Sequence, residues 1–119
     1  MGKLLINCTH GSEDPERATL AFVVGNVAAS ADQEVVVLLT IEGVRNATHG
    51  YADGICKEGF QPLKDVMQSF LGNGGKIWAC GACAKPRGIT DADVVEGAQI
   101  VTAAKAVEYL ASGAASLSF

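Results

Sequence analysis

The sequence predicts one α/β domain with a five-stranded, mainly parallel sheet and helices on both of its faces. Segments of strand character alternate with segments of helix character along all 119 residues, and this alternation is typical of parallel sheets. The run Val-Val-Val-Leu-Leu at 35–39 is apolar without alternation, as in a strand buried on both faces. An amphipathic stripe at helical spacing is formed by Leu63, Val66, Met67, Phe70 and Leu71.

The amino-terminal third is predicted to form a strand, a helix and a second strand. The first strand, Lys3–Cys8, is a short apolar run that ends in a polar turn. Asp14 can accept backbone N–H groups at the start of the helix, and Pro15 suits its first turn. This helix is apolar nearly all round, so it has to be covered on more than one side. We expect the sheet to cover one side and a second subunit to cover the other.

The middle of the chain is predicted to form a central strand, a loop, a helix and a third strand. The central strand spans 34–40, and a glycine-bearing loop follows at 41–61. Pro62 begins the amphipathic helix, which the Gly-Asn-Gly-Gly sequence at 72–75 ends. The third strand, Lys76–Cys80, is short and apolar.

The carboxy-terminal part is predicted to add one short helix, a fourth strand, a last helix and a fifth strand. A loop is expected at 81–89, after which Thr90 and Asp93 resemble a capping box that starts a short helix at 91–96. The fourth and fifth strands are expected at 98–102 and 115–119. The helix between them presents an apolar face made of Ala103, Ala104, Val107, Leu110 and Ala111.

The composition excludes several classes of protein. Hydrophobic residues make up 49% and charged residues 18% of the chain, which is a globular composition rather than a disordered one. The formal net charge of −4 lacks the basic footprint of a nucleic-acid-binding protein. No apolar run approaches the roughly 18 residues of a membrane span, and the first residues lack a signal-peptide pattern. We therefore expect a cytoplasmic protein whose cysteines stay reduced.

Cys80 is the strongest candidate for a catalytic residue. It ends the third predicted strand, and ligands of parallel α/β sheets bind beyond the carboxyl ends of the strands. Gly81 leaves room around the thiol, and Lys85 and Arg87 follow in the same loop. Nearby cations favour the thiolate, which is the nucleophilic form. The alternative is that Cys80 packs under the loop as an inert side chain.

Cys83 completes a Cys-x-x-Cys spacing with Cys80, and three interpretations stay open. The two thiols can form a dithiol/disulfide couple, although Lys85, Pro86 and Gly88 favour a loop rather than the helix that usually follows this motif. They can supply half of a zinc site, but no second Cys-x-x-Cys exists. Cys83 can also be a bystander or a resolving thiol beside Cys80. We expect no metal and no organic cofactor.

The remaining cysteines and histidines have weaker signals. Cys8 lies within the first predicted strand, where a free cysteine packs as a small hydrophobic residue. Cys56 lies in a glycine-bearing loop and has no assigned role. His10 follows the first strand and either faces Cys80 as a proton carrier or is a turn residue. His49 is expected to be structural or exposed to solvent.

The segment at 80–89, Cys-Gly-Ala-Cys-Ala-Lys-Pro-Arg-Gly-Ile, resembles the active-site segment of the DsrE/DsrF-like family. The stretch Glu-Asp-Pro-Glu-Arg-Ala-Thr-Leu-Ala-Phe at 13–22 and the ending Leu-Ser-Phe at 117–119 fit the same family. The resemblance covers essentially the whole chain. The family includes the sulfur-relay subunits of the TusBCD complex and the DsrEFH proteins of sulfur oxidisers.

The resemblance implies a three-layer, flavodoxin-like fold and assembly as a homotrimer or hexamer. It also implies that Cys80 carries sulfur as a persulfide, with Gly81 and Gly88 in the loop that surrounds it. Sulfur-donor and sulfur-acceptor proteins would then be partners, and no nucleic acid or membrane would be. Two other functions stay open: a thiol-disulfide redox protein or sensor that uses Cys80 and Cys83, and a non-catalytic subunit that binds a small ligand or takes part in assembly.

Overall fold

The computed structural model describes residues 2–119 and contains one five-stranded sheet in which all strands are parallel. The strand order is β4-β3-β2-β1-β5, so the apolar run of the second strand lies at the centre, as the sequence predicts. The strands are β1 (Lys3–Cys8), β2 (Glu34–Leu39), β3 (Lys76–Cys80), β4 (Ala98–Val101) and β5 (Ala115–Ser118). The α/β class with a parallel sheet is therefore confirmed.

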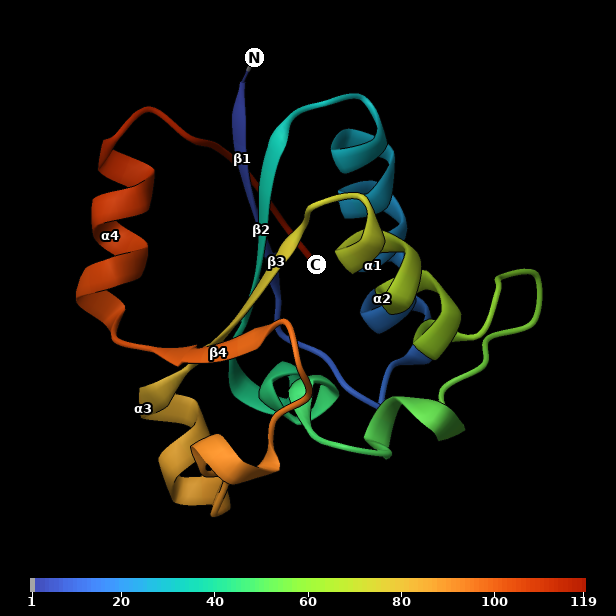
Figure 1. Ribbon diagram of the computed structural model, residues 1–119. Helices are drawn as coiled ribbons and strands as arrows, with labels where there is room; N and C mark the ends of the chain where they lie inside the picture. Colours follow the sequence, from blue (N-terminus) through green and yellow to red (C-terminus); the bar gives the residue numbers. More distant parts are fainter. Residues whose placement is uncertain (1) are drawn as a thin grey trace.

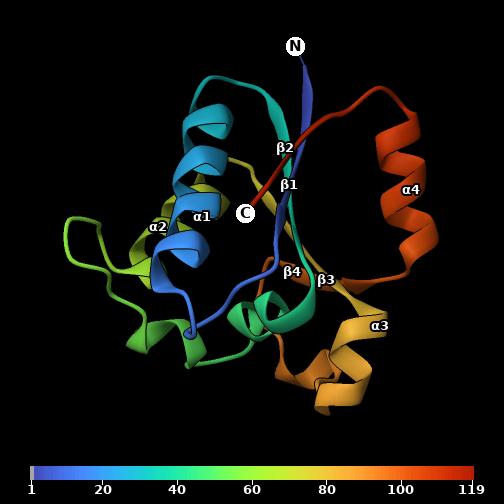
Figure 2. The ribbon, with the colours of Figure 1, turned by 180° about the vertical axis from the view of Figure 1, so that it is seen from behind.

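Helices cover both faces of this sheet and form the outer layers of a three-layer structure (Figures 1 and 2). Helices α1 (Pro15–Ser30) and α2 (Leu63–Gly72) lie on one face, and α4 (Ala103–Ala111) lies on the other. None of the helices in residues 2–119 has the length and apolar character needed to cross a bilayer.

The larger core lies between the sheet and the α1–α2 pair. Phe22 of α1 and Phe70 of α2 are fully buried and meet edge to face, with their ring centroids 5.8 Å apart. Gly25 of α1 lies against Phe70 and Val37, where a side chain would be crowded. Helix α2 of the same chain thus covers a second side of the apolar helix α1, and cover by a second subunit stays a prediction. Val27 remains 65% exposed.

The opposite face has a smaller core under the single helix α4. Trp78 of β3 and Tyr109 of α4 pack edge to face at 5.4 Å between ring centroids, and Val36 is buried beside Trp78. The apolar face that the sequence indicates for α4 does not pack on the sheet, because Val107 is 63% exposed and Leu110 is 39% exposed. A helix of small side chains has two nearly equivalent apolar sides, and the aromatic contact of Tyr109 selects the side that includes Ala106.

Within residues 2–119, four short 3₁₀ helices and one helical turn lie beyond the carboxyl ends of the strands (Figure 1). They are η1 (Ile41–Ala47), η2 (Tyr51–Gly54), η3 (Lys85–Arg87), η4 (Asp91–Asp93) and the turn α3 (Gly81–Ala84). The predicted loops at 41–61 and 81–89 are therefore partly helical. The short helix expected at 91–96 is only η4, although its capping box of Thr90 and Asp93 is present. Val94 and Val95 leave the helix to pair with Thr48 and Ala47.

The turn η1 is fixed to the sheet through its glycine. The Gly43 N–H donates to the carbonyls of Thr40 at 2.9 Å and Thr9 at 3.2 Å. A Cβ atom at Gly43 would collide with the carbonyl oxygen of Cys8 in β1. Because the colliding atom belongs to the backbone of an inner strand, it cannot move aside cheaply, so only glycine allows η1 to lie this close.

The close approach of η1 gives a stability prediction. Gly43→Ala should lower the free energy of unfolding by about 1–3 kcal/mol, the usual cost of forcing an extra methyl group into packed structure. Gly54→Ala is the matched control, since Gly54 ends η2 in open space, and it should change stability by no more than about 1 kcal/mol. Urea unfolding of both variants checks this. Equal stabilities would contradict the role of Gly43.

Candidate functional site

Cys80 is the last residue of β3 and lies at the carboxyl edge of the sheet between β2 and β4. It pairs in register with Val101 of β4 and is partly exposed. It also forms the N-cap of α3, and its side chain makes no capping hydrogen bond. A Cβ atom at Gly81 would lie 3.2 Å from the Val101 carbonyl oxygen, so glycine lets the chain turn tightly against β4. Cys80 is therefore held by rigid backbone, and the residue stays partly exposed while its side chain packs against the core.

Cys83 lies in the helical turn that Cys80 caps, and both thiols are free and partly exposed. The sequence favoured a loop here, and that expectation was wrong. Pro86 is tolerated because it lies in the first turn of η3, where its missing N–H is not needed. Gly88 then ends η3 in the left-handed region at φ 70°. The Cys-x-x-Cys motif thus begins a helical turn, as such motifs usually do.

Arg87 is held by a carboxylate of η1. Its Nε donates to Glu42 at 2.8 Å, and its Nη1 donates to the Cys83 carbonyl at 3.1 Å. Arg45 also donates to Glu42, at 3.0 Å. Arg87 is therefore paired with Glu42, which it shares with Arg45, and its side chain braces the cysteine segment, which we define as residues 80–88, against η1. Lys85 is exposed, and among residues 2–119 it forms no ion pair.

These contacts determine the titration of Glu42. The hydrogen bond from Arg87 and the weaker one from Arg45 lower the pKa of Glu42 below its ordinary value of 4.5, because they stabilise the ionised form. The side chain of Glu42 is 37% exposed, so solvent screens much of this interaction.

His10 lies after β1, at the start of the segment leading to α1. Its Nδ1 is 2.6 Å from Glu13 Oε2, and its backbone carbonyl accepts a hydrogen bond from Asn46 at 2.9 Å. β2 separates β1 from β3, so the ends of the two strands are about 10 Å apart. His10 therefore contacts Glu13 of its own segment and Asn46 of η1, and it does not contact Cys80.

The other cysteines differ in burial. Cys8 is fully buried in the core, as the sequence predicts, and burial raises the pKa of its thiol to about 11. Cys56 is exposed in the segment between η2 and α2. His49 is exposed, and its backbone N–H donates to the Asp93 backbone carbonyl. Within residues 2–119, no three or more His, Cys, Asp or Glu side chains form a group that could hold a metal ion.

Sequence reasoning missed two residues that organise this edge of the sheet. The sequence places Glu42 after the central strand, at the edge of the sheet where ligands bind. No residue near Glu42 in the sequence indicates its contact with Arg87, which is 45 positions away. Nothing in the sequence distinguishes Asn46 from the other polar residues of the loop predicted at 41–61. Its side chain is fully buried and donates to the His10 carbonyl.

Comparisons with known proteins agree with this architecture. A model of the DsrE/DsrF-like family matches residues 2–119. The uncharacterized protein MJ0760 of Methanocaldococcus jannaschii is 30% identical over 108 residues, which is 91% of this chain. The chain spans 39% of that relative's length.

Two solved structures have the same fold. The ychN protein from E. coli superposes with a TM-score of 0.84 at 16% identity, and all of both chains is covered. The protein of unknown function MTH1491 from Methanobacterium thermoautotrophicum gives a TM-score of 0.76 at 18% identity, again with all of both chains covered. At these identities the likeness concerns the fold.

The Glu42 contacts predict how stability depends on pH. Because the folded pKa of Glu42 is lowered, its contribution should be complete above pH 4.5 and be lost as the pH falls through the folded value. Glu42→Gln should therefore lower the free energy of unfolding at pH 7 by at most about 1 kcal/mol, and this difference should vanish in acid. Urea unfolding against pH measures it. Glu58→Gln, at an exposed turn position, is the control, and an identical pH profile for both variants would contradict the role of Glu42.

Proposed function

Because this chain belongs to the DsrE/DsrF-like family, which is linked to sulfur relay, we propose that it carries sulfane sulfur as a persulfide on Cys80. The observation that carries the proposal is the position of Cys80, a partly exposed thiol on the last residue of an inner strand. A sulfur carrier needs a thiol that two partners can reach in turn and a backbone that presents it in one place.

Sulfur transfer requires two exchanges of S–S bonds. The Cys80 thiolate attacks the outer sulfur of a donor persulfide, a new S–S bond forms on Cys80, and the donor leaves as a thiolate. The thiolate of an acceptor then attacks the outer sulfur, and Cys80 leaves as a thiolate in its turn. Each step breaks one S–S bond and forms one, so neither an oxidant nor a metal is needed.

The neighbours of Cys80 have separate roles in this proposal. Lys85 is the cation of the segment that carries no ion pair among the described residues, and it supplies positive charge to the outer sulfur of the persulfide. Arg87 is a positioning residue, because it binds Glu42 and the Cys83 carbonyl. Gly81 and Gly88 allow the turns on either side of the segment. His10 would act as a proton carrier only after it leaves Glu13 and crosses the roughly 10 Å between the ends of β1 and β3.

A second candidate function is thiol-disulfide exchange by Cys80 and Cys83. The helical turn after Cys80 supports thiol-disulfide exchange, which the loop predicted from the sequence did not. A Cys-x-x-Cys motif at the start of a helix is the arrangement found in thiol oxidoreductases. The two functions can also be joined. The Cys83 thiolate would attack the inner sulfur of the Cys80 persulfide, form a Cys80–Cys83 disulfide and release hydrosulfide.

We further propose that the protein assembles as a homotrimer or hexamer and exchanges sulfur with donor and acceptor proteins in the reducing environment of the cytoplasm. DsrE-like proteins act in complexes. Support within this chain comes from the thinly covered side of the sheet, where Val107 and Leu110 of α4 are exposed, and from the edge strand β5, whose four residues are all exposed. Exposed apolar side chains and an open strand edge are features of protein interfaces.

Persulfide formation is tested by mass spectrometry after incubation with glutathione persulfide. The wild-type protein should gain one sulfur on Cys80, and Cys80→Ser should lose this adduct completely. Cys56→Ser is the matched control, because it removes an exposed thiol outside the cysteine segment. This variant should gain one sulfur on Cys80, as the wild-type protein does. Equal loading of Cys56 and Cys80 in the wild-type protein would contradict the proposal.

The role of Cys83 is tested on the loaded protein once excess donor is removed. If Cys83 resolves the persulfide, a Cys80–Cys83 disulfide and free hydrosulfide should accumulate together, and Cys83→Ser should keep the persulfide at least several times longer. Peptide mapping without reduction identifies the disulfide. A persulfide of equal lifetime in the two proteins would exclude the resolving function and leave simple carriage by Cys80.

A further inference from the structure

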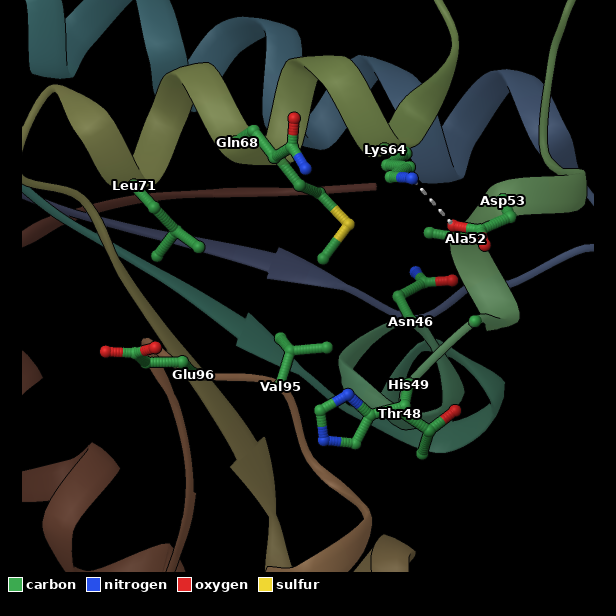
Figure 3. A pocket seen from close by; sticks show the side chains of 12 residues that line it. Asn46, Thr48, His49, Ala52, Asp53, Lys64, Gln68, Leu71, Val95 and Glu96 are labelled. Carbon is green, nitrogen blue, oxygen red and sulfur yellow. Dashed lines mark ion pairs between the residues drawn. The ribbon is translucent and has the colours of Figure 1, made fainter.

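A concave site lies on the α1–α2 side of the molecule, apart from the cysteine segment. It is a pocket of about 380 Å³ between α2, the end of η1 with the following turn, and the chain just before β4 (Figure 3). Small-molecule sites commonly begin near this volume. None of its lining residues belongs to 80–88, and η1 packs against α3, so η1 stands between the two sites.

Asn46 provides an unpartnered acceptor in the wall of this pocket. The side chain is fully buried, and its Nδ2 donates to the His10 carbonyl at 2.9 Å. This bond fixes the orientation of the amide, because only the nitrogen can donate to a carbonyl. The Oδ1 atom is then buried without any hydrogen-bond partner. Such a group costs roughly 1–3 kcal/mol while it stays unpaired, and an N–H or O–H group in the pocket would satisfy it.

The charges around the pocket favour a cation. Two carboxylates, Asp53 and Glu96, line it against one ammonium group, that of Lys64. Lys64 Nζ lies 3.9 Å from Asp53 Oδ1 (Figure 3), so its charge is already offset by that carboxylate. Glu96 is exposed and forms no ion pair among residues 2–119. The surplus charge of the lining is therefore negative while His49 is neutral.

The remaining wall is apolar. Met67 is only 5% exposed, and Leu71 and Val95 are half-buried beside it in the lining. Leu71 is also held from behind by Gly97, where a Cβ atom would press against its side chain. An aliphatic or aromatic stem can lie on these three side chains while the polar end of the same molecule meets the acceptors.

We propose that this pocket binds a small organic amine in its ammonium form, with an apolar stem. The ammonium group supplies N–H donors for Asn46 Oδ1 and positive charge for the lining that contains Glu96, and the stem packs on Met67, Leu71 and Val95. An organic anion is disfavoured, because it would leave Asn46 Oδ1 unpaired and would approach two carboxylates.

The probe for this site is 2-phenylethylamine, compared with 2-phenylethanol and 3-phenylpropionate, which share its aromatic stem. Titration followed by ¹H–¹⁵N NMR should show saturable shifts of the Asn46 and Gln68 side-chain amides with the amine. The alcohol should bind more weakly by roughly tenfold, the loss expected for a charge-assisted hydrogen bond, and the carboxylate should not bind.

Variants separate this site from the rest of the molecule. Glu96→Gln should weaken amine binding several-fold, and Gln68→Trp, at an exposed position of the lining, should fill the pocket and abolish binding. Glu108→Gln, at an exposed position of α4 on the other face, is the matched control for charge and should bind as the wild type does. Cys80→Ser should also bind normally, so a failure of the sulfur-carrier proposal would leave this result unchanged.

The proposal is overturned if the amine gives no saturable shift at millimolar concentration. It is also overturned if 3-phenylpropionate binds as well as the amine, or if Glu96→Gln and Glu108→Gln weaken binding equally.

Discussion

The close contact of η1 with the end of β1 is the constraint on which the rest of the carboxyl edge depends. Gly43 brings the backbone of η1 against the Cys8 carbonyl, at a distance that no other residue type allows, and its N–H ties the turn to Thr9 and Thr40. The start of η1 is thereby fixed relative to the sheet, and the hydrogen bond from Asn46 to the His10 carbonyl holds its other end. Glu42 then faces the cysteine segment and Asn46 faces the pocket, so one short turn supplies a wall to each site.

The two sites differ in what their neighbours do. At the cysteine segment, Glu42 binds Arg87 and so braces the segment against η1, while Cys80 and Cys83 are free cysteines and partly exposed. In the pocket, the hydrogen bond from Asn46 to His10 leaves a buried oxygen without a partner. The first arrangement suits covalent chemistry on a surface thiol, and the second suits reversible binding of a donor group.

The parts of the fold that could be predicted are those with local signals. The apolar run of β2, the stripe of α2 and the caps at Asp14 and Thr90 act within a few residues, and the structure has each of them where it was expected. The placement of Cys80 at the end of β3 follows from the same short-range pattern.

The parts that could not be predicted depend on contacts between distant residues. The buried side of α4 is chosen by the contact of Tyr109 with Trp78, and one side of α1 is covered by α2 through the contact of Phe22 with Phe70. The helical turn after Cys80 is braced by Glu42, and the pocket exists because η1 carries Asn46 beneath α2. The residues of each contacting pair are far apart in the sequence. The periodicity of apolar residues along the chain therefore does not predict that they come into contact.

The most direct test of the central claim is the chemical state of Cys80 in protein freshly purified from cells without reductant. Alkylation followed by fragment-ion mass spectrometry distinguishes Cys80 from Cys83 within the peptide that contains both. The account predicts a persulfide on a measurable fraction of Cys80 and none on Cys56, and loss of the added sulfur after dithiothreitol treatment. An unmodified Cys80 that also stays unmodified after exposure to a persulfide donor would contradict it.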